Sequence, residues 1–178
     1  RPRLTLIMGL SLAALAAPAL AQDPARIDQL VQVQANSGAF TGSVLVARDG
    51  HVVFDKGYGQ ANREWNIPND GQTKFRLGSV TKQFTAAAIM LLVEQGKLDL
   101  DTPIKTWLPE APATWDAITL RHLMAHTSGI PNFTDFPDFA AQNTLPASLD
   151  SLIARFKDRP LDFVPGEKVT YSNSGYIL

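Results

Sequence analysis

Ser79 and Lys82 lie three positions apart, at the start of a segment whose later residues have helical apolar spacing. Residues three apart on a helix face the same side, so the two side chains are expected to be neighbours. A serine hydroxyl is a poor nucleophile at neutral pH, and an adjacent amine that is partly neutral can accept its proton. Backbone N–H groups at the start of the helix would also bind an oxyanion. The pair therefore predicts acyl transfer to Ser79, with Lys82 as the activating partner.

A second motif is needed, because a Ser-x-x-Lys pattern often arises by chance as a helix-capping serine and an exposed lysine. Residues 165–176 read Pro-Gly-Glu-Lys-Val-Thr-Tyr-Ser-Asn-Ser-Gly-Tyr, which predicts a loop that opens a helix. Tyr171 can relay a proton when a lysine stabilises its phenolate, and the Asn173 amide can bind both a lysine and a substrate carbonyl. Alone, Tyr171 would be interpreted as a half-buried core aromatic. Together, the two motifs predict an active site.

The chain resembles the serine β-lactamase-related family, especially class C β-lactamases, D-alanyl-D-alanine carboxypeptidases and related esterases. The resemblance extends over residues 23–178. It rests on three ordered motifs: residues 75–85, the Leu-Met-Ala-His-Thr-Ser-Gly-Ile segment at 123–130, and residues 165–176. It implies an α+β fold of the β-lactamase/transpeptidase type, with an antiparallel sheet flanked by helices and a mainly helical subdomain.

The resemblance also implies roles for four residues. Ser79 would be the acylated nucleophile, Lys82 its activator, and Tyr171 a general base of the class C type. Asn173 would bind substrate and the lysine. Whether Lys82 or Tyr171 takes the serine proton stays open. No metal or organic cofactor is implied. The family's third motif, Lys-Thr-Gly or His-x-Gly on a sheet-edge strand, does not occur in these 178 residues and is expected beyond Leu178.

The elements that must position these residues begin with a β-rich segment. Two β-rich runs, residues 42–48 and 51–56, flank an Asp-Gly pair, which predicts a hairpin. An Asp-Pro pair predicts the start of a short amphipathic helix over residues 23–35, on the surface of a core. A two-stranded hairpin is marginal by itself, so its further sheet partners are also expected beyond Leu178.

The rest of the chain has helical patterns. A helix is expected from Ser79, with apolar side chains on one broad face, burial of most of its surface, and Gly96 as its stop signal. Shorter helices are expected around residues 103–107, 119–126 and 148–157. The predicted organisation is a signal peptide at 1–21, the start of an α/β region at 22–78, and a helical region at 79–178.

The first 21 residues have the pattern of a secretory signal. Arg1 and Arg3 precede an apolar run of Leu and Ala that ends in Ala-Leu-Ala at residues 19–21. Pro18 and the short run argue against a transmembrane anchor. We therefore expect cleavage before Gln22, no integral membrane span afterwards, and an exported bacterial protein, periplasmic or secreted.

Composition excludes several other classes of function. The chain contains no cysteine, so it has no disulfide framework, thiolate metal site or thiol nucleophile. Its net charge is −1, and without residues 1–21 it has 14 basic and 17 acidic residues, a net charge of −3. This balance offers no electrostatic basis for binding nucleic acid or an anionic membrane. The expected partner is a small molecule or a peptidoglycan peptide.

Some other residues invite functional interpretations that the sequence does not favour. His122 and His126 are four apart, but Leu123 occupies the place of the glutamate in a zinc-protease motif, so no metal is expected. Ser128 lacks a nucleophile-elbow motif and is expected to cap or turn the chain. Glu167 is expected to be a loop residue. An aromatic group is expected mainly in the core or a pocket wall: Trp107, Trp115, Phe133, Phe136 and Phe139.

The sequence thus predicts a serine hydrolase that forms an acyl-enzyme with an amide or ester. The substrate could be a β-lactam, a D-alanyl-D-alanine peptide, a D-amino-acid peptide or a small ester. The alternative is a penicillin-binding sensor or a non-catalytic scaffold of the same fold. Because the third motif is missing, we expect residues 1–178 alone neither to fold stably nor to turn over substrate.

Overall fold

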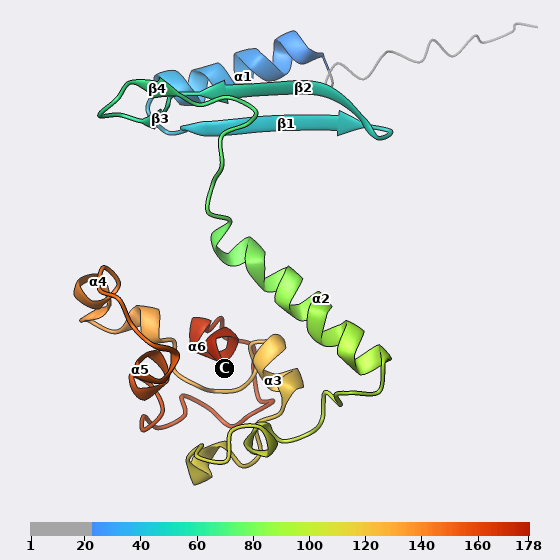
Figure 1. Cartoon of the computed structure of the whole chain (residues 1–178), viewed down its shortest axis with the longest axis vertical. Coiled ribbons are helices and arrows are strands. Elements are labelled where there is room, and N and C mark those ends of the chain that lie inside the picture. The colour runs from blue at the N-terminus through green and yellow to red at the C-terminus, as the bar shows by residue number, and fades with distance from the viewer. Residues whose placement is uncertain (1–22) are drawn as a thin grey trace, which may run out of the picture. The chain divides into compact units, whose positions relative to one another are not determined.

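The computed structural model describes residues 23–178, and the signal peptide expected at residues 1–21 lies outside them. The described chain forms two compact units, one ending at Arg76 and the other comprising Leu77–Leu178 (Figure 1). The strands belong to the first unit, whereas the second is built from helices and loops.

The first unit begins with helix α1 (Pro24–Asn36). The Asp23 carboxylate accepts a hydrogen bond from the Ala25 N–H at 2.9 Å, and Pro24 occupies the first helical position, as the Asp-Pro pair predicts. Ile27 and Val31 are half-buried and no α1 residue is fully buried, so the helix lies on the surface of its unit.

The predicted hairpin is confirmed as β1 (Gly42–Arg48) and β2 (His51–Tyr58), paired antiparallel. Asp49 and Gly50 have φ angles of 49° and 78°, and two successive positive φ angles match the turn to the twist of the strands. Two short strands follow and pair with each other: β3 (Gln60–Asn62) and β4 (Ile67–Pro68).

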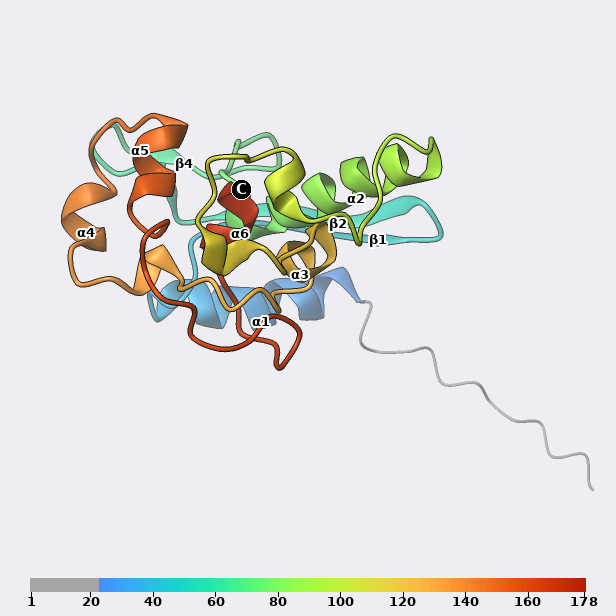
Figure 2. The same ribbon diagram turned by 90° about the horizontal axis from the view of Figure 1, so that it is seen from below.

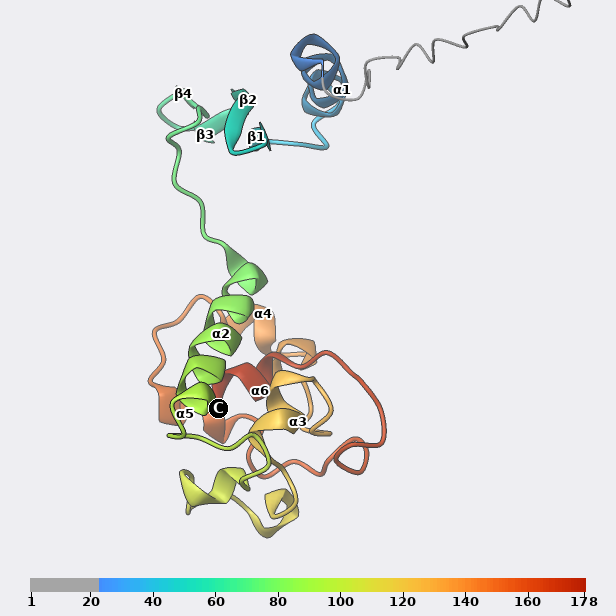
Figure 3. The same cartoon turned by 90° about the vertical axis from the view of Figure 1, so that its right-hand side faces the viewer.

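Asp28 joins α1 to β2, which lie beside each other (Figure 3). Its carboxylate accepts hydrogen bonds from Lys56 Nζ at 2.7 Å and from the Tyr58 hydroxyl at 2.8 Å. Burial, together with the hydrogen bond to Asp28, raises the pKa of Tyr58 to about 12. The phenol therefore stays protonated and remains a donor to Asp28 throughout the physiological pH range.

The second unit contains helical turns in each of the three regions where short helices are expected. In chain order its elements are η2 (Gly78–Val80), α2 (Thr81–Glu94), η3 (Ile104–Thr106), η4 (Ala113–Trp115), α3 (Leu120–Met124), η5 (Phe133–Asp135), α4 (Phe139–Gln142), α5 (Leu149–Ala154) and α6 (Asn173–Ile177). Helix α6 lies between α3 and α5 and contacts both (Figures 1 and 2). This central position matters because α6 begins at one of the predicted site residues.

The core of the second unit lies around stacked aromatic rings. The Trp115 and Phe156 rings have centroids 6.1 Å apart and both side chains are almost fully buried. The rest of the cluster is mainly aliphatic: Ile104, Ile118, Leu123, Ile130 and Phe133. Of the aromatic residues that the sequence assigns to the core or a pocket wall, Trp115 and Phe133 belong to this core, and Phe136 and Phe139 pack against it.

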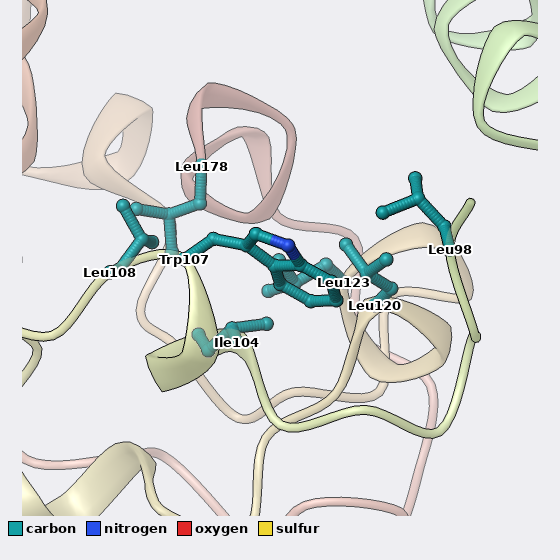
Figure 4. Close-up of a pocket in the computed structure, with 7 residues that line it drawn as sticks. All are labelled: Leu98, Ile104, Trp107, Leu108, Leu120, Leu123 and Leu178. Carbon is teal, nitrogen blue, oxygen red and sulfur yellow. The ribbon is translucent and has the colours of Figure 1, made fainter. Parts of the chain in front are cut away.

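Trp107 is the remaining aromatic of that group, and it lies in a pocket wall. The pocket has a volume of about 210 Å³ and is apolar (Figure 4). Its lining residues are Leu98, Ile104, Trp107, Leu108, Leu120, Leu123 and Leu178.

The expectation that α2 is mostly buried is wrong for the described chain. Phe84 and Leu91, on the face predicted to be covered, are 60% and 56% exposed, and no α2 residue is buried. The half-buried residues form a different stripe: Lys82, Ala86, Ile89 and Val93. The helix is apolar on most sides, so its pattern does not specify the face that packs. Among residues 23–178, no helix is both long and apolar enough to cross a bilayer.

Candidate active site

The structure brings Ser79, Lys82, Tyr171 and Asn173 into one hydrogen-bonded cluster. Ser79 Oγ lies 2.6 Å from the Tyr171 hydroxyl oxygen. Lys82 Nζ donates to Ser79 Oγ at 3.1 Å and to Asn173 Oδ1 at 2.8 Å. The Tyr171 hydroxyl is also 3.3 Å from Asn173 Oδ1. Each of the four side chains therefore contacts at least two of the others.

Local backbone geometry positions Ser79 and Lys82. Gly78 has a φ of 54°, which places the start of the 3₁₀ turn η2 in the left-handed region that favours glycine. Ser79 lies within that turn, and Lys82 follows at the start of α2, three residues later on the same face. Ser79 is exposed, whereas Lys82 is half-buried. The nucleophile candidate is thus accessible while the amine is held in place.

Tyr171 and Asn173 are held by the segment after α3. The Thr170 N–H donates to the His126 carbonyl at 2.8 Å, and the Ser172 N–H donates to His126 Nδ1 at 3.2 Å. These two bonds flank Tyr171, whose side chain is 47% exposed. Tyr171 is therefore not the half-buried core aromatic that its motif alone would suggest.

Asn132 and Thr134 are site-supporting residues that the sequence analysis missed. Asn132 Oδ1 accepts a hydrogen bond from the Asn173 N–H at 2.9 Å, and Thr134 Oγ1 accepts one from Asn173 Nδ2 at 3.1 Å. Lys82, which can only donate, fixes Oδ1 as the end of the Asn173 amide that faces it, and Thr134 supplies the acceptor for the other end. The available signal was their position, directly after the Gly-Ile-Pro that ends the 123–130 segment.

Ser174, next to Asn173 in the sequence, anchors the start of α6. Its side chain is fully buried, donates to the Pro131 carbonyl at 2.6 Å and accepts from the Phe133 N–H at 3.0 Å. A buried hydroxyl with both functions satisfied is costly to displace. The α6 helix is therefore fixed to the 131–134 loop that carries Asn132 and Thr134.

The electrostatics of the cluster act on Tyr171. Lys82 lowers the pKa of the Tyr171 phenol below its ordinary value of 10, and the Ser79 hydroxyl lowers it further, whereas burial acts in the opposite direction. Lys82 Nζ also lies 4.9 Å from the centroid of the Tyr171 ring. A cation so placed favours the phenolate. The arrangement thus raises the fraction of Tyr171 present as phenolate, the form that can accept a proton, above that of a free tyrosine.

Three of the residues that the sequence did not favour as functional, Ser128, Glu167 and His122, have local contacts outside the cluster. Ser128 Oγ is buried and accepts from the Ile130 N–H at 3.3 Å, so it stabilises a turn as expected. Glu167 accepts from the Val164 N–H at 3.2 Å, within its loop. His122 Nδ1 accepts from the Thr119 N–H at 3.2 Å, in a capping box of α3.

Comparison with known proteins gives this geometry a context. Residues 25–178 match the sequence profile of the β-lactamase family. The chain belongs to the β-lactamase family. It is 34% identical over 171 residues to esterase EstB of Burkholderia gladioli, an alignment that covers 83% of this chain and 42% of EstB.

Solved structures of family members agree with the fold. A penicillin-binding protein from Bacillus halodurans is 34% identical, with a TM-score of 0.70, and the match covers 83% of this chain and 47% of that protein. A D-amino acid amidase from Ochrobactrum anthropi is 29% identical, with a TM-score of 0.59, over 76% of this chain and 37% of the amidase. The α+β fold of the β-lactamase/transpeptidase type is therefore confirmed. The chain spans less than half the length of these β-lactamase-family relatives.

The pKa order of the three tyrosines is testable. Tyr58 and Tyr176 have raised pKa values, Tyr176 mainly because of burial, so Tyr171 should ionise first as pH rises. Replacing Lys82 with Met should move the Tyr171 transition to higher pH, because the cation that favours the phenolate is gone. The measurement is tyrosinate absorbance against pH in the full-length protein, with Tyr171→Phe subtracted to isolate this phenol.

The matched control is Lys105→Met, since Lys105 pairs with Asp116 outside the cluster. This variant should leave the Tyr171 transition unchanged. An unaltered transition in Lys82→Met would contradict the electrostatic coupling.

Proposed function

We propose that this β-lactamase-family protein is a serine hydrolase that forms an acyl-enzyme on Ser79 from an amide or ester substrate. The observation that carries the proposal is the position of Ser79 Oγ, 2.6 Å from the Tyr171 oxygen and 3.1 Å from Lys82 Nζ. A hydroxyl in contact with both a proton acceptor and a cation is the arrangement that activates a serine nucleophile.

The apolar pocket of Figure 4 is separate from this site, because none of the four cluster residues lines it.

The direction of the hydrogen bonds favours Tyr171 over Lys82 as the proton acceptor. Lys82 Nζ already donates to Ser79 Oγ and to Asn173 Oδ1, so the serine proton is directed toward the Tyr171 oxygen. Lys82 then acts through its charge, which favours the Tyr171 phenolate and stabilises the serine oxygen as it loses its proton.

The reaction follows from this assignment. The Ser79 proton passes to the Tyr171 phenolate while Oγ forms a bond to the substrate carbonyl carbon. The carbon–nitrogen or carbon–oxygen bond then breaks, and the leaving group takes the proton from Tyr171. In the second half-reaction, the Tyr171 phenolate takes a proton from water, which attacks the ester carbonyl. Tyr171 then returns the proton to Ser79 Oγ as the acid is released.

The proposed substrates are small amides and esters, including β-lactams and peptidoglycan peptides. Relatives in the family are named as an esterase, a penicillin-binding protein and a D-amino acid amidase. These names share acyl transfer at a carbonyl but differ in leaving group, which fits a site whose shared part is the nucleophile. Export through the expected signal peptide would bring such a protein to peptidoglycan and antibiotics.

A substrate panel tests this function directly. The full-length protein would be assayed with a chromogenic β-lactam, a D-alanyl-D-alanine peptide, a D-amino acid amide and a short-chain ester. At least one substrate should be hydrolysed, and Ser79→Ala should lower kcat by about a thousandfold or more.

Ser37→Ala is the matched control, because Ser37 is an exposed serine whose hydroxyl donates to the Gln34 carbonyl near the end of α1, outside the cluster. It should retain wild-type turnover. Hydrolysis that survives in Ser79→Ala would reject Ser79 as the nucleophile.

Thr134 provides a second test, since its hydroxyl accepts a hydrogen bond from the Asn173 amide. Thr134→Val leaves Asn173 Nδ2 without its acceptor and removes one of the contacts that hold the amide beside Lys82. An unsatisfied donor of this kind costs about 1–3 kcal/mol, so acylation should slow by about fivefold or more.

Thr134→Ser keeps the hydroxyl and should acylate at close to the wild-type rate. Pre-steady-state acylation with the best substrate from the panel measures both variants. Equal rates for the Val and Ser variants would show that acylation does not depend on the acceptor that Thr134 supplies.

A further inference from the structure

His126 contacts the candidate active site through Tyr171 and its neighbours in the sequence. Its imidazole packs against two phenol rings, with centroids 4.6 Å from that of Tyr171 and 5.2 Å from that of Tyr176. Its Nδ1 accepts the Ser172 N–H at 3.2 Å, and its carbonyl accepts the Thr170 N–H at 2.8 Å. One residue therefore contacts the backbone on both sides of Tyr171 and also the Tyr171 ring.

The backbone of His126 is specialised for this contact. It has a φ of 58°, in the left-handed region that residues other than glycine rarely adopt. The residue follows directly after α3 and its cap Ala125, so this conformation ends the helix and turns the chain. The same turn directs the ring toward Tyr171. His126 thus combines an unusual backbone conformation with three contacts to residues 170–172.

The second phenol completes the support. The Tyr176 hydroxyl donates to the Met124 carbonyl at 3.1 Å, which ties α6 to the end of α3. The His126 ring therefore contacts a tyrosine that is itself fixed. Tyr171 is the exposed partner of the same ring.

We propose that neutral His126 is a positioning residue that holds the Tyr171 phenol in reach of Ser79, and that a proton on His126 releases Tyr171 and slows acylation. This inference rests on the proposed roles of Ser79 and Tyr171. Because Nδ1 accepts the Ser172 N–H, it must be unprotonated, and the neutral ring carries its proton on Nε2. Protonation at Nδ1 would set one N–H against another and break that bond.

The surroundings of His126 oppose protonation. The titratable or charged groups that face it are Lys82 from α2, Tyr171 from the loop before α6, and Tyr176 from α6. Burial lowers the pKa of His126 below its ordinary value of 6.5, and the charge of Lys82 lowers it further. The folded protein therefore binds fewer protons here than the unfolded chain. The stability that neutral His126 contributes, and the active geometry that it supports, are present above pH 6.5. Both are lost as the pH falls through the lowered pKa of His126.

Two variants of the full-length protein, His126→Asn and His126→Ala, distinguish the hydrogen-bond acceptor of the Ser172 N–H from the rest of the His126 side chain. Asparagine tolerates a positive φ, and its Oδ1 can accept the Ser172 N–H, but it does not titrate. His126→Ala should lower kcat by about a hundredfold with little change in KM, because it misplaces a catalytic group without removing it. His126→Asn should recover part of that loss. In wild type, kcat/KM should fall with acid in two steps, one set by protonation of the Tyr171 phenolate and a second, below pH 6.5, set by His126. Only the second step should be absent from His126→Asn.

The control is His122→Gln, which keeps the side-chain acceptor of the α3 capping box and should retain the wild-type step below pH 6.5. A step below pH 6.5 that persists unchanged in His126→Asn would overturn the proposal, because a group other than His126 would then cause it.

A second measurement does not depend on activity or on the folding of a variant. Nitrogen-15 spectra of the wild-type imidazoles should show His126 protonated on Nε2 at neutral pH, with a titration that coincides with the step below pH 6.5. The Nδ1-protonated tautomer, or a titration above pH 6.5, would overturn the proposal. The Ser79→Ala assay judges the proposed function separately, so the two failures are distinguishable.

Discussion

The hydrogen bonds of the Lys82 ammonium group constrain the whole second unit. They join Ser79, in the turn before α2, to Asn173, the first residue of α6, which lies 91 positions after Lys82. Lys82 Nζ can donate to both Ser79 Oγ and Asn173 Oδ1 only if α2 and α6 begin within a few ångströms of each other. The packing of α6 between α3 and α5 therefore places Asn173 at Lys82 as well as contributing to the core.

Residues outside the cluster hold Asn173 and Tyr171 in place. Ser174 fixes the start of α6 to the 131–134 loop through its fully buried hydroxyl, and Asn132 and Thr134 in that loop bind the backbone and the amide of Asn173. His126 performs the corresponding task for Tyr171. Of the groups that hold Asn173, Ser174 is fully buried, whereas Asn132 and Thr134 are half-buried, as are Lys82 and Asn173 themselves. The proposed nucleophile Ser79 is exposed, and Ser174 supplies rigidity without contacting it.

Local signals in the sequence predict local structure well. The Asp-Gly pair at 49–50 and the Asp-Pro pair at 23–24 correctly locate a hairpin turn and a helix start, because each acts through the φ angles and hydrogen bonds of adjacent residues. The spacing of Ser79 and Lys82 likewise predicts their contact. The packed face of α2 was not predictable, since apolar residues on most sides leave the choice to tertiary contacts. The role of the His126 ring depends on a left-handed backbone and on Tyr176, 50 residues away, which no local pattern encodes.

The central claim is that Ser79 becomes acylated within this cluster, and locating the acyl group tests it most directly. The full-length protein would be incubated with a β-lactam or an activated ester, quenched and digested, and the modified peptide identified by mass spectrometry. The account predicts an added acyl mass on Ser79 that forms much more slowly in Tyr171→Phe. An acyl group on another residue such as Ser128, or turnover without any covalent adduct, would contradict it.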